Sequence, residues 1–340
     1  MRWKTSTAIA VVGTLAVLAP PVPAAADTPG YAHTTAVGVH NTYDKAKFAH
    51  LAQALDTGAG LIELDVYADT FPVKQWRVNH ELLGQSNNCT AASTAAQLYT
   101  GSVNQKLDTC LTDLKLWHDA HPGHAPVVVK VELKIGFEAN KGLGPAEFDA
   151  LLTAKLGSAL FTPAHLLAKP DGTRYATLDA AAAADNWPAR SAMAGRFVFE
   201  IIPGTVERGN PFDTLPTDVE YGRYLRDHAG AGAAFPAVLD AAAGDPRTRF
   251  GEADIRPWFV FFDGDAATYA AGIDTSWYDS HHYLLNMTDA SGVAPAIDAT
   301  NPTTAQAQAR IALLAAAHAS IVSTDWAAST GVLATVTGRG

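Results

Sequence analysis

The sequence predicts a single α/β domain of the (β/α) TIM-type barrel class. Strand-like and helix-like segments alternate along most of the chain, which favours a parallel sheet covered by helices. A length of 340 residues fits one barrel, and 48% hydrophobic with 17% charged residues is enough to bury a large core. Residues 204–254, rich in Gly, Pro and Asp, give no clear pattern. We therefore expect residues 27–340 to form one distorted or incomplete barrel.

The spacing of apolar residues sets the expected elements in order. Apolar side chains recur on one face over residues 43–57, 107–120 and 145–156, which predicts three helices. Gly58 ends the first helix, His121-Pro122-Gly123 ends the second, and Pro145 begins the third. An Ala-rich helix is expected at 303–317. Strands are expected at 35–40, 61–67, 126–134, 196–202, 258–263, 282–287 and 319–323, with a further extended segment at 75–81.

Residues 1–26 have the pattern of a cleaved secretory signal. Arg2 and Lys4 precede the apolar run 8–18, prolines follow it, and three alanines end at Ala26. The run is too short to span a bilayer comfortably, and no later segment approaches ~20 uninterrupted apolar residues. We therefore expect a secreted protein without a transmembrane segment, cleaved near Ala26, with an uncleaved anchor as the alternative.

Cys89 and Cys110 are the only cysteines. Outside the cell, an isolated pair most often forms a disulfide. Closing a loop of about 20 residues would stabilise the fold by roughly 3 kcal/mol. A metal site or a nucleophile is the alternative, but the C-x-x-C spacing that would support it is absent.

The charge balance excludes one class of partner. The chain has 24 Lys and Arg against 34 Asp and Glu, a formal charge of −10, and loss of Arg2 and Lys4 with the signal would make it −12. Nucleic acid is therefore not expected as a partner, because phosphate backbones need an excess of cations. The same charge disfavours an anionic lipid surface.

The strand Leu61-Ile62-Glu63-Leu64-Asp65-Val66 carries two carboxylates at positions i and i+2. They share one face, and both faces of a strand in a parallel barrel are covered, so Glu63 and Asp65 are expected to be buried side by side. Two like charges so placed are costly unless a cation neutralises them, and oxygen ligands suit a hard divalent ion. Internal salt bridges at a strand end are the alternative.

The strand at 126–134 has the same feature. Lys130, Glu132 and Lys134 alternate with valines and a leucine, so the three charged residues share one face. In a barrel this face lines the interior, which makes Glu132 a third carboxylate beside the first two. A solvent-exposed antiparallel strand is the alternative.

Two histidines are expected at the same end of the barrel. His40 and Asn41 close the first strand, and His80 follows the segment that begins at Gln75. Active sites of barrel enzymes lie at the carboxyl ends of the strands, so these histidines are candidates for general acid–base catalysis. A structural role is the alternative for each.

Together these residues resemble the catalytic domain of calcium-dependent phosphatidylinositol-specific phospholipase C, of the small secreted bacterial kind. The resemblance lies in His40-Asn41 after a short strand, Glu63-x-Asp65 about twenty residues on, His80 soon after, and Glu132 on the next core strand. It covers roughly residues 35–134, and residues 319–326 (A-S-I-V-S-T-D-W) look like the final barrel strand of that family.

The resemblance implies a Ca²⁺ ion held by Asn41, Glu63, Asp65 and Glu132. It implies that the inositol 2-hydroxyl, polarised by the metal, attacks its own phosphodiester while diacylglycerol leaves. His80 would protonate the leaving alkoxide and later act as a base toward water, His40 would stabilise charge on the phosphate, and Lys134 would contact the phosphate or the ring. The implied partner is a phosphoinositide at a membrane surface, and a monomer is expected.

Later polar residues cannot be matched to the family motif, and a structural role is favoured for them. They are Arg196, Glu200, Asp263, Tyr283 and Asp325.

Two other functions remain open from the sequence. Glycerophosphodiester phosphodiesterases and sphingomyelinase-D-like enzymes also carry a histidine, E-x-D and a second histidine on a barrel. Their first histidine is typically followed by Arg-Gly and their second by Asp, whereas here Asn41-Thr42 and Glu81 follow. The second alternative is a catalytically inert secreted binding barrel, which would need one of the six motif positions to be lost, and none is.

Overall fold

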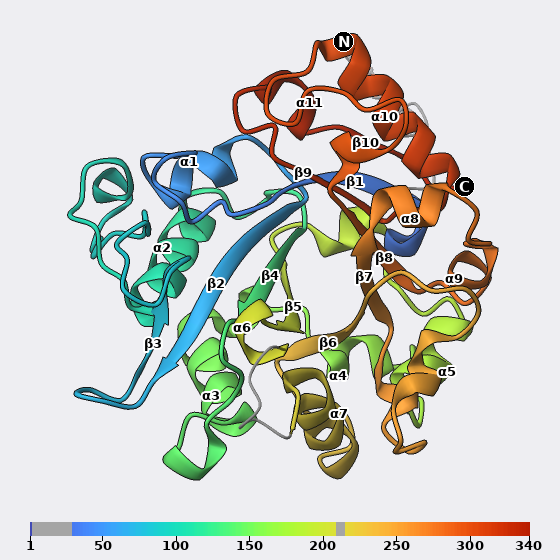
Figure 1. The fold of residues 1–340 in the computed structure, drawn as a ribbon, viewed down its shortest axis with the longest axis horizontal. Helices are drawn as coiled ribbons and strands as arrows, with labels where there is room; N and C mark the ends of the chain where they lie inside the picture. Colours follow the sequence, from blue (N-terminus) through green and yellow to red (C-terminus); the bar gives the residue numbers. More distant parts are fainter. Residues whose placement is uncertain (2–28, 209–214) are drawn as a thin grey trace.

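Eight parallel strands close into a barrel in this computed structural model, which describes Met1 and residues 29–208 and 215–340. The predicted signal at residues 1–26 lies, apart from Met1, outside the described residues. Around the barrel the strands run β1 (Thr34–Val39), β2 (Leu61–Asp69), β4 (Val127–Leu133), β5 (Phe197–Pro203), β6 (Ala234–Leu239), β7 (Phe261–Asp265), β8 (Leu284–Thr288) and β9 (Ile321–Thr324), which returns to β1 (Figure 1).

The predicted TIM-type α/β barrel is therefore confirmed, and the sheet is closed and not incomplete. The stretch without a clear pattern contains α7 (Thr217–Asp227) and β6, which complete the alternation. The pairing between the first two strands, β1 and β2, is nevertheless the shortest in the barrel. It consists of one residue pair, Gly38 opposite Leu61. A Cβ atom on Gly38 would lie 2.9 Å from the Cβ of Leu61 and 2.9 Å from Cγ2 of Ile321, so only glycine permits this approach.

Two short antiparallel strands extend the sheet beyond the barrel. β3 (Gln75–Val78) pairs with the end of β2, and β10 (Val336–Gly338) pairs with the start of β1. β3 therefore begins the chain segment that leads to His80, on the side of the barrel where β2 ends.

Helices cover the outside of the barrel (Figure 1). The helices α2 (Leu107–Ala120) and α3 (Pro145–Leu156) have the predicted bounds, and α10 (Thr304–Ala316) differs from its prediction by one residue at each end. The shorter helices are α1 (Leu51–Asp56), α4 (Pro163–Leu167), α5 (Leu178–Ala183), α6 (Thr205–Arg208), α8 (Ala266–Ala270), α9 (Ser276–Ser280) and α11 (Thr330–Leu333).

The first helix is shorter than its sequence pattern predicted. It begins at Leu51 and not at residue 43, because the amide of Asn88 donates hydrogen bonds of 2.8 Å to the carbonyls of Thr42 and Phe48. Asp44 also forms an isolated bridge with Asn87. These contacts hold the residues after β1 in a turn, so the chain leaves the barrel wall immediately after His40.

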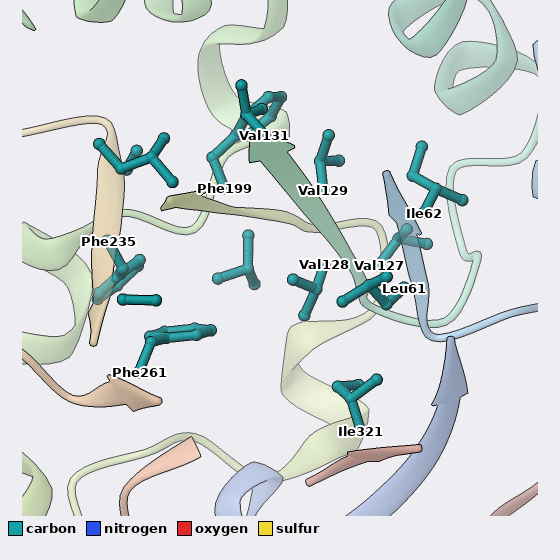
Figure 2. Packing of buried hydrophobic residues seen from close by; sticks show 14 of the residues in the cluster. Leu61, Ile62, Val127, Val128, Val129, Val131, Phe199, Phe235, Phe261 and Ile321 are labelled. Atoms are coloured by element: carbon teal, nitrogen blue, oxygen red, sulfur yellow. The ribbon is translucent and has the colours of Figure 1, made fainter. Parts of the chain in front are cut away.

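The barrel interior is apolar at the amino ends of the strands and polar toward their carboxyl ends. Figure 2 shows Leu61, Val128, Phe235, Phe261 and Ile321 among the packed residues, all buried. Four of these five strands carry a polar side chain two residues further along, on the same face. The five residues after that step are Glu63, Lys130, Ala237, Asp263 and Ser323, of which only the alanine is apolar.

The loop after β3 is fixed to α2 by two contacts. Cys89 and Cys110 form the expected disulfide, with their α-carbons 4.9 Å apart. Next to it, Thr90 donates its backbone N–H (2.5 Å) and its hydroxyl (3.0 Å) to the carboxylate of Asp113. Burial raises the pKa of Asp113 to about 6, although the hydrogen bonds from Thr90 act to lower it.

This carboxyl predicts a pH dependence of stability. An aspartate has a pKa near ~3.9 when unfolded, so between about pH 4 and 6 the folded chain binds more protons than the unfolded chain. The free energy of unfolding should therefore fall by ~2 kcal/mol from pH 4 to pH 7 relative to Asp113→Asn. Chemical denaturation across this range measures the difference. Asp119→Asn, an exposed site on the same helix, is the matched control, and a pH-independent difference for Asp113→Asn would contradict the prediction.

Candidate active site

A cavity of about 440 Å³ opens at the carboxyl ends of the barrel strands. Its wall includes charged side chains that the sequence predicted for the site. It also includes residues from the later strands. Among them are His40, Glu63, Lys130, Glu132, Asp263 and Asp325. The cavity lies where parallel barrels place their active sites.

Three carboxylates converge beside this cavity. β2 and β4 pair so that Asp65 lies opposite Glu132 and Glu63 lies opposite Lys130. Glu63, Asp65 and Glu132 each bring an oxygen within 4.8 Å of the others. The side chains of Glu63 and Asp65 are 3% and 1% exposed, so their charges are almost fully removed from water. The prediction that they lie buried side by side is confirmed.

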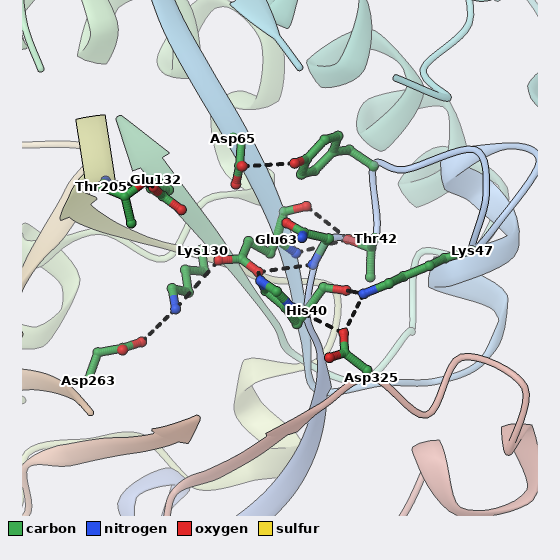
Figure 3. A network of polar contacts seen from close by, with 12 residues as sticks. His40, Thr42, Lys47, Glu63, Asp65, Lys130, Glu132, Thr205, Asp263 and Asp325 are labelled. Carbon is green, nitrogen blue, oxygen red and sulfur yellow. Dashed lines mark hydrogen bonds and ion pairs between the residues drawn. The ribbon is translucent and has the colours of Figure 1, made fainter. Parts of the chain in front are cut away.

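Two buried lysines, Lys130 and Lys134, partly neutralise the carboxylates, and Figure 3 shows Lys130 between Glu63 and Asp263. Nζ of Lys130 lies 3.5 Å from Glu63 and 2.9 Å from Asp263. Nζ of Lys134 lies 3.2 Å from Asp65 and 2.9 Å from Glu132. Four carboxyl groups therefore share two ammonium groups, and the cluster keeps a capacity for further positive charge. Lys134 faces this cluster, while its role as a substrate contact stays a prediction.

The two carboxyls on β2 have opposite pKa shifts. Burial, with Glu63 and Glu132 close by, raises the pKa of Asp65 to about 7 against the effect of Lys134. Burial also acts to raise the pKa of Glu63, but Lys130, His40 and the backbone N–H of Asn41 together lower it. Glu63 is thus held ionised, while Asp65 titrates near neutral pH unless a cation compensates it.

Two oxygens in this cluster are buried without a hydrogen-bond donor: Oδ1 of Asn41 and Oδ1 of Asp65. A buried acceptor without a partner is costly, and a cation satisfies it. Asn41 has a positive φ of 52°, and its backbone N–H donates to Glu63 over 3.0 Å. The turn after β1 thereby brings an amide oxygen and a carboxylate together. An all-oxygen set of one amide and three carboxyl groups fits a hard ion such as Ca²⁺.

His40 lies at the rim of the cavity between two carboxylates. Its Nε2 is 3.6 Å from Glu63, and its Nδ1 is 3.1 Å from Asp325. Burial alone would lower the pKa of His40, but the hydrogen bond to Asp325 and the charge of Glu63 outweigh it and raise the pKa. With its side chain 47% exposed, the imidazole remains accessible to a substrate from the cavity.

Asp325 and Lys47 fix the orientation of His40 (Figure 3). Nζ of Lys47 forms a very short contact with Asp325 and donates to the carbonyl of His40 over 2.8 Å. Burial acts to raise the pKa of Asp325, but the hydrogen bonds from His40 and Lys47 lower it to about 2. Sequence reasoning favoured a structural role for Asp325 and did not identify Lys47. The polar Ser-Thr-Asp ending of the last strand was the only sequence signal for Asp325. Its contact with His40 joins residues 285 positions apart, so no local pattern predicts it.

His80 is tied to the site through its backbone. Asn79 donates its N–H to the carbonyl of Asp65 over 3.0 Å, and the Tyr67 hydroxyl donates to the carbonyl of His80 over 3.1 Å. The imidazole is 46% exposed, its Nδ1 lies 2.7 Å from Glu81, and it is not among the residues that line the cavity. Five of the six motif residues thus meet in one cluster, and the catalytic position of His80 stays a prediction.

The cavity wall at the carboxyl ends of β6, β7 and β8 is acidic. It carries Asp240, Asp265 and Asp289 beside Asp263, with Arg208 as a cationic member. Arg208 is already paired with Asp240 at 2.7 Å. This part of the cavity therefore favours a ligand with hydrogen-bond donors, such as hydroxyl groups, over one with additional anionic groups.

Comparison with known proteins agrees with this geometry. Residues 28–213 match the family model for phosphoinositide phospholipase C, Ca²⁺-dependent. A solved Ca²⁺-dependent phosphatidylinositol-specific phospholipase C from Streptomyces antibioticus is 52% identical, with a TM-score of 0.87, over 92% of this chain and 99% of that one. A calcium-dependent phosphoinositol-specific phospholipase C from a Pseudomonas species shares the fold at 17% identity and a TM-score of 0.67, over 92% of this chain and 96% of that one. No curated protein matches the sequence.

Proposed function

This chain belongs to the calcium-dependent phosphoinositide phospholipase C family, whose members are phosphoric diester hydrolases, and from that premise we propose how its own residues act. The substrate is phosphatidylinositol, and the products are diacylglycerol and an inositol phosphate that is first formed as a cyclic diester. The observation that carries this proposal is a cluster of two buried carboxylates and one half-buried carboxylate beside His40, in which Oδ1 of Asp65 and the neighbouring Oδ1 of Asn41 have no hydrogen-bond partner.

Calcium fits the donor set of this cluster. Asn41, Glu63, Asp65 and Glu132 would hold the ion, because all four offer oxygen and two of those oxygens lack any other partner. When bound, Ca²⁺ supplies Lewis-acid stabilisation of negative charge and lowers the pKa of a coordinated hydroxyl. Lys130 and Lys134 balance the remaining carboxylate charge from the two sides of the cluster.

His40 would bind a phosphate oxygen. Asp325 accepts from Nδ1, which leaves Nε2 as the nitrogen that faces the cavity, and the raised pKa of His40 favours the cationic ring. A cationic donor held in one orientation stabilises the charge that builds up as the inositol 2-hydroxyl gives its proton to a carboxylate of the cluster and its oxygen attacks phosphorus. Asp325 and Lys47 are positioning residues in this scheme, since they act through His40.

His80 would handle the proton of the leaving group. As the bond from phosphorus to the diacylglycerol oxygen breaks, the imidazolium transfers its proton to that oxygen, and the neutral imidazole then accepts a proton from the water that opens the cyclic diester. Glu81, 2.7 Å from Nδ1, would orient the ring for both steps.

The site would work at a membrane surface outside the cell. The signal pattern at residues 1–26 supports export, and in the described ranges we find no helix that could cross a bilayer. A monomer would suffice, because all six motif residues come from one chain. The −12 charge expected of the mature chain argues for contact through apolar side chains and not through basic ones.

Such side chains are present next to the site. Phe71, in the β2–β3 connection, is 88% exposed, and Leu82 and Leu83, just after His80, are 58% and 97% exposed. Both segments follow the carboxyl end of β2, which is the end that carries the candidate active site. Exposed apolar side chains near a lipid-cleaving site can insert into the interface between head groups and acyl chains.

The function is tested by phosphorus NMR of the products from phosphatidylinositol. With calcium, we expect a cyclic phosphodiester signal together with released diacylglycerol, and a chelator should abolish both. Because the cavity wall at the ends of β6, β7 and β8 is acidic, phosphatidylinositol should be cleaved faster than its 4,5-bisphosphate. Phosphatidic acid as the lipid product, or an acyclic inositol phosphate with no cyclic precursor, would instead favour a glycerophosphodiester phosphodiesterase or sphingomyelinase-D-like activity.

The assigned roles predict two different kinds of variant. His80→Ala should leave the calcium affinity nearly intact but reduce turnover by ~10²–10⁴, the usual contribution of one general acid. Asp65→Asn and Glu132→Gln should weaken calcium binding, and added calcium should recover part of their activity. Turnover measured over a calcium titration separates the two. The loss for His80→Ala should shrink with a phenolic leaving group, which departs without protonation. The roles are wrong if excess calcium rescues His80→Ala but not the carboxylate variants.

The membrane contact predicts a separation of binding from chemistry. The double variant Leu82→Ser, Leu83→Ser should bind phosphatidylinositol vesicles at least tenfold less, because burying a leucine side chain contributes roughly 1.5–3 kcal/mol. Its turnover of a soluble, non-aggregated substrate should stay unchanged. Co-sedimentation with vesicles measures the binding. Val336→Ser, an exposed apolar site on β10 at the other end of the barrel, is the control. Equal loss in both variants would rule out a local contact.

A further inference from the structure

A second group of metal-binding side chains lies at the amino ends of the strands, away from the candidate active site. His33 ends the 3₁₀ helix Tyr31–His33 just before β1, Asp185 follows α5, and His282 precedes β8. Each offers one ligand atom, and these atoms lie within 4.8 Å of one another. Nε2 of His33 is 2.9 Å from Oδ2 of Asp185, and the two imidazole rings have centroids 5.1 Å apart.

The backbone holds two of these residues in place for a ligand. The carbonyl of Ala182 accepts both the N–H of Asp185, at 2.8 Å, and Nδ1 of His282, at 3.1 Å. Because Nδ1 of His282 faces a carbonyl, it carries the hydrogen, and the lone pair of the neutral ring is on Nε2. This is the arrangement by which proteins orient histidine ligands: one ring nitrogen on a backbone carbonyl and the other on the metal.

We propose that His33, Asp185 and His282 bind a zinc ion that is separate from the calcium of the active site. Two imidazoles and one carboxylate suit Zn²⁺, which binds nitrogen and oxygen ligands in four-coordinate sites, and a water would complete the set. Calcium is a poor occupant, because it takes oxygen ligands. The ion would take the place of the hydrogen atom in the hydrogen bond between His33 and Asp185. His282 would be its third protein ligand.

The site would have a structural role, since the amino ends of barrel strands contribute to stability and not to catalysis. The ion would join segments that Arg339 already connects by hydrogen bonds. Arg339 donates Nη1 to the carbonyls of Ala32, at 2.9 Å, and Tyr283, at 2.8 Å, and its N–H to the carbonyl of His33, at 3.0 Å. Ala32 and Tyr283 are the chain neighbours of the two histidine ligands. Zinc would thus fasten the segment before β1 to the barrel.

The test is a zinc titration of the full chain with millimolar calcium present, so that the active site is already occupied. Calorimetry should show one zinc bound per chain. At a hundredfold excess over Kd, the melting temperature should rise by about 3–6 °C. Co²⁺ in place of zinc should give the visible absorption of a four-coordinate site. No binding up to about 0.1 mM zinc, far above what a functional structural zinc site needs, would overturn the proposal.

Variants assign the binding to these residues. His282→Asn and Asp185→Asn should each weaken zinc binding at least tenfold, and asparagine tolerates the positive φ of 55° and 52° at these positions. His228→Asn is the matched control, because Nδ1 of His228 also contacts a backbone carbonyl, that of Tyr224, but lies outside the cluster. All three variants should cleave phosphatidylinositol at the wild-type rate. Unchanged zinc affinity in His282→Asn and Asp185→Asn would place the ion elsewhere and overturn the proposal.

Discussion

The burial of like charges inside the barrel is the constraint on which the rest of this structure depends. Glu63, Asp65 and Glu132 converge at one end of a closed sheet, where burial of the first two leaves little water to screen their charges. Such a group is stable only if cations and hydrogen-bond donors surround it. Lys130 in β4 and Lys134 directly after it lie on either side of Glu132 in the sequence and supply part of this positive charge. The charge that they leave uncompensated is what gives the cluster its affinity for a divalent ion.

The apolar layer beneath supports this polar one. Leu61, Val128 and Phe261 fill the barrel at the amino ends of their strands, and the next inward residue on each strand is charged. Because inward-facing residues recur every two positions along a strand, the same strand can carry an apolar residue that stabilises the barrel and, two positions later, a charged residue of the site. The weakly paired seam between β1 and β2 lies beside the cluster, and there the chain turns at Asn41 and presents its amide oxygen.

Local pattern in the sequence predicted the parts of the site that lie on regular strands. Glu63 with Asp65, and Lys130 with Glu132, could be assigned to inward faces because alternation is a local property. Strand β6 was missed because Ala234–Leu239 is short and contains a proline, and α7 because its sequence is largely polar. Long-range pairing was beyond reach: nothing near Asp325 in the sequence indicates that it meets His40 and Lys47.

The two proposed catalytic histidines are held in physically different ways, and this difference fits their tasks. Asp325 and Lys47 hold His40 in one orientation. A group that stabilises charge at one fixed point needs such a fixed orientation. His80 is attached by its backbone to the strand that carries Asp65, and the disulfide at Cys89 fixes the far end of its loop. Its ring is left exposed beside Leu82 and Leu83. A general acid for a lipid leaving group has to reach the oxygen at the membrane boundary, so an exposed ring on an anchored loop suits that step.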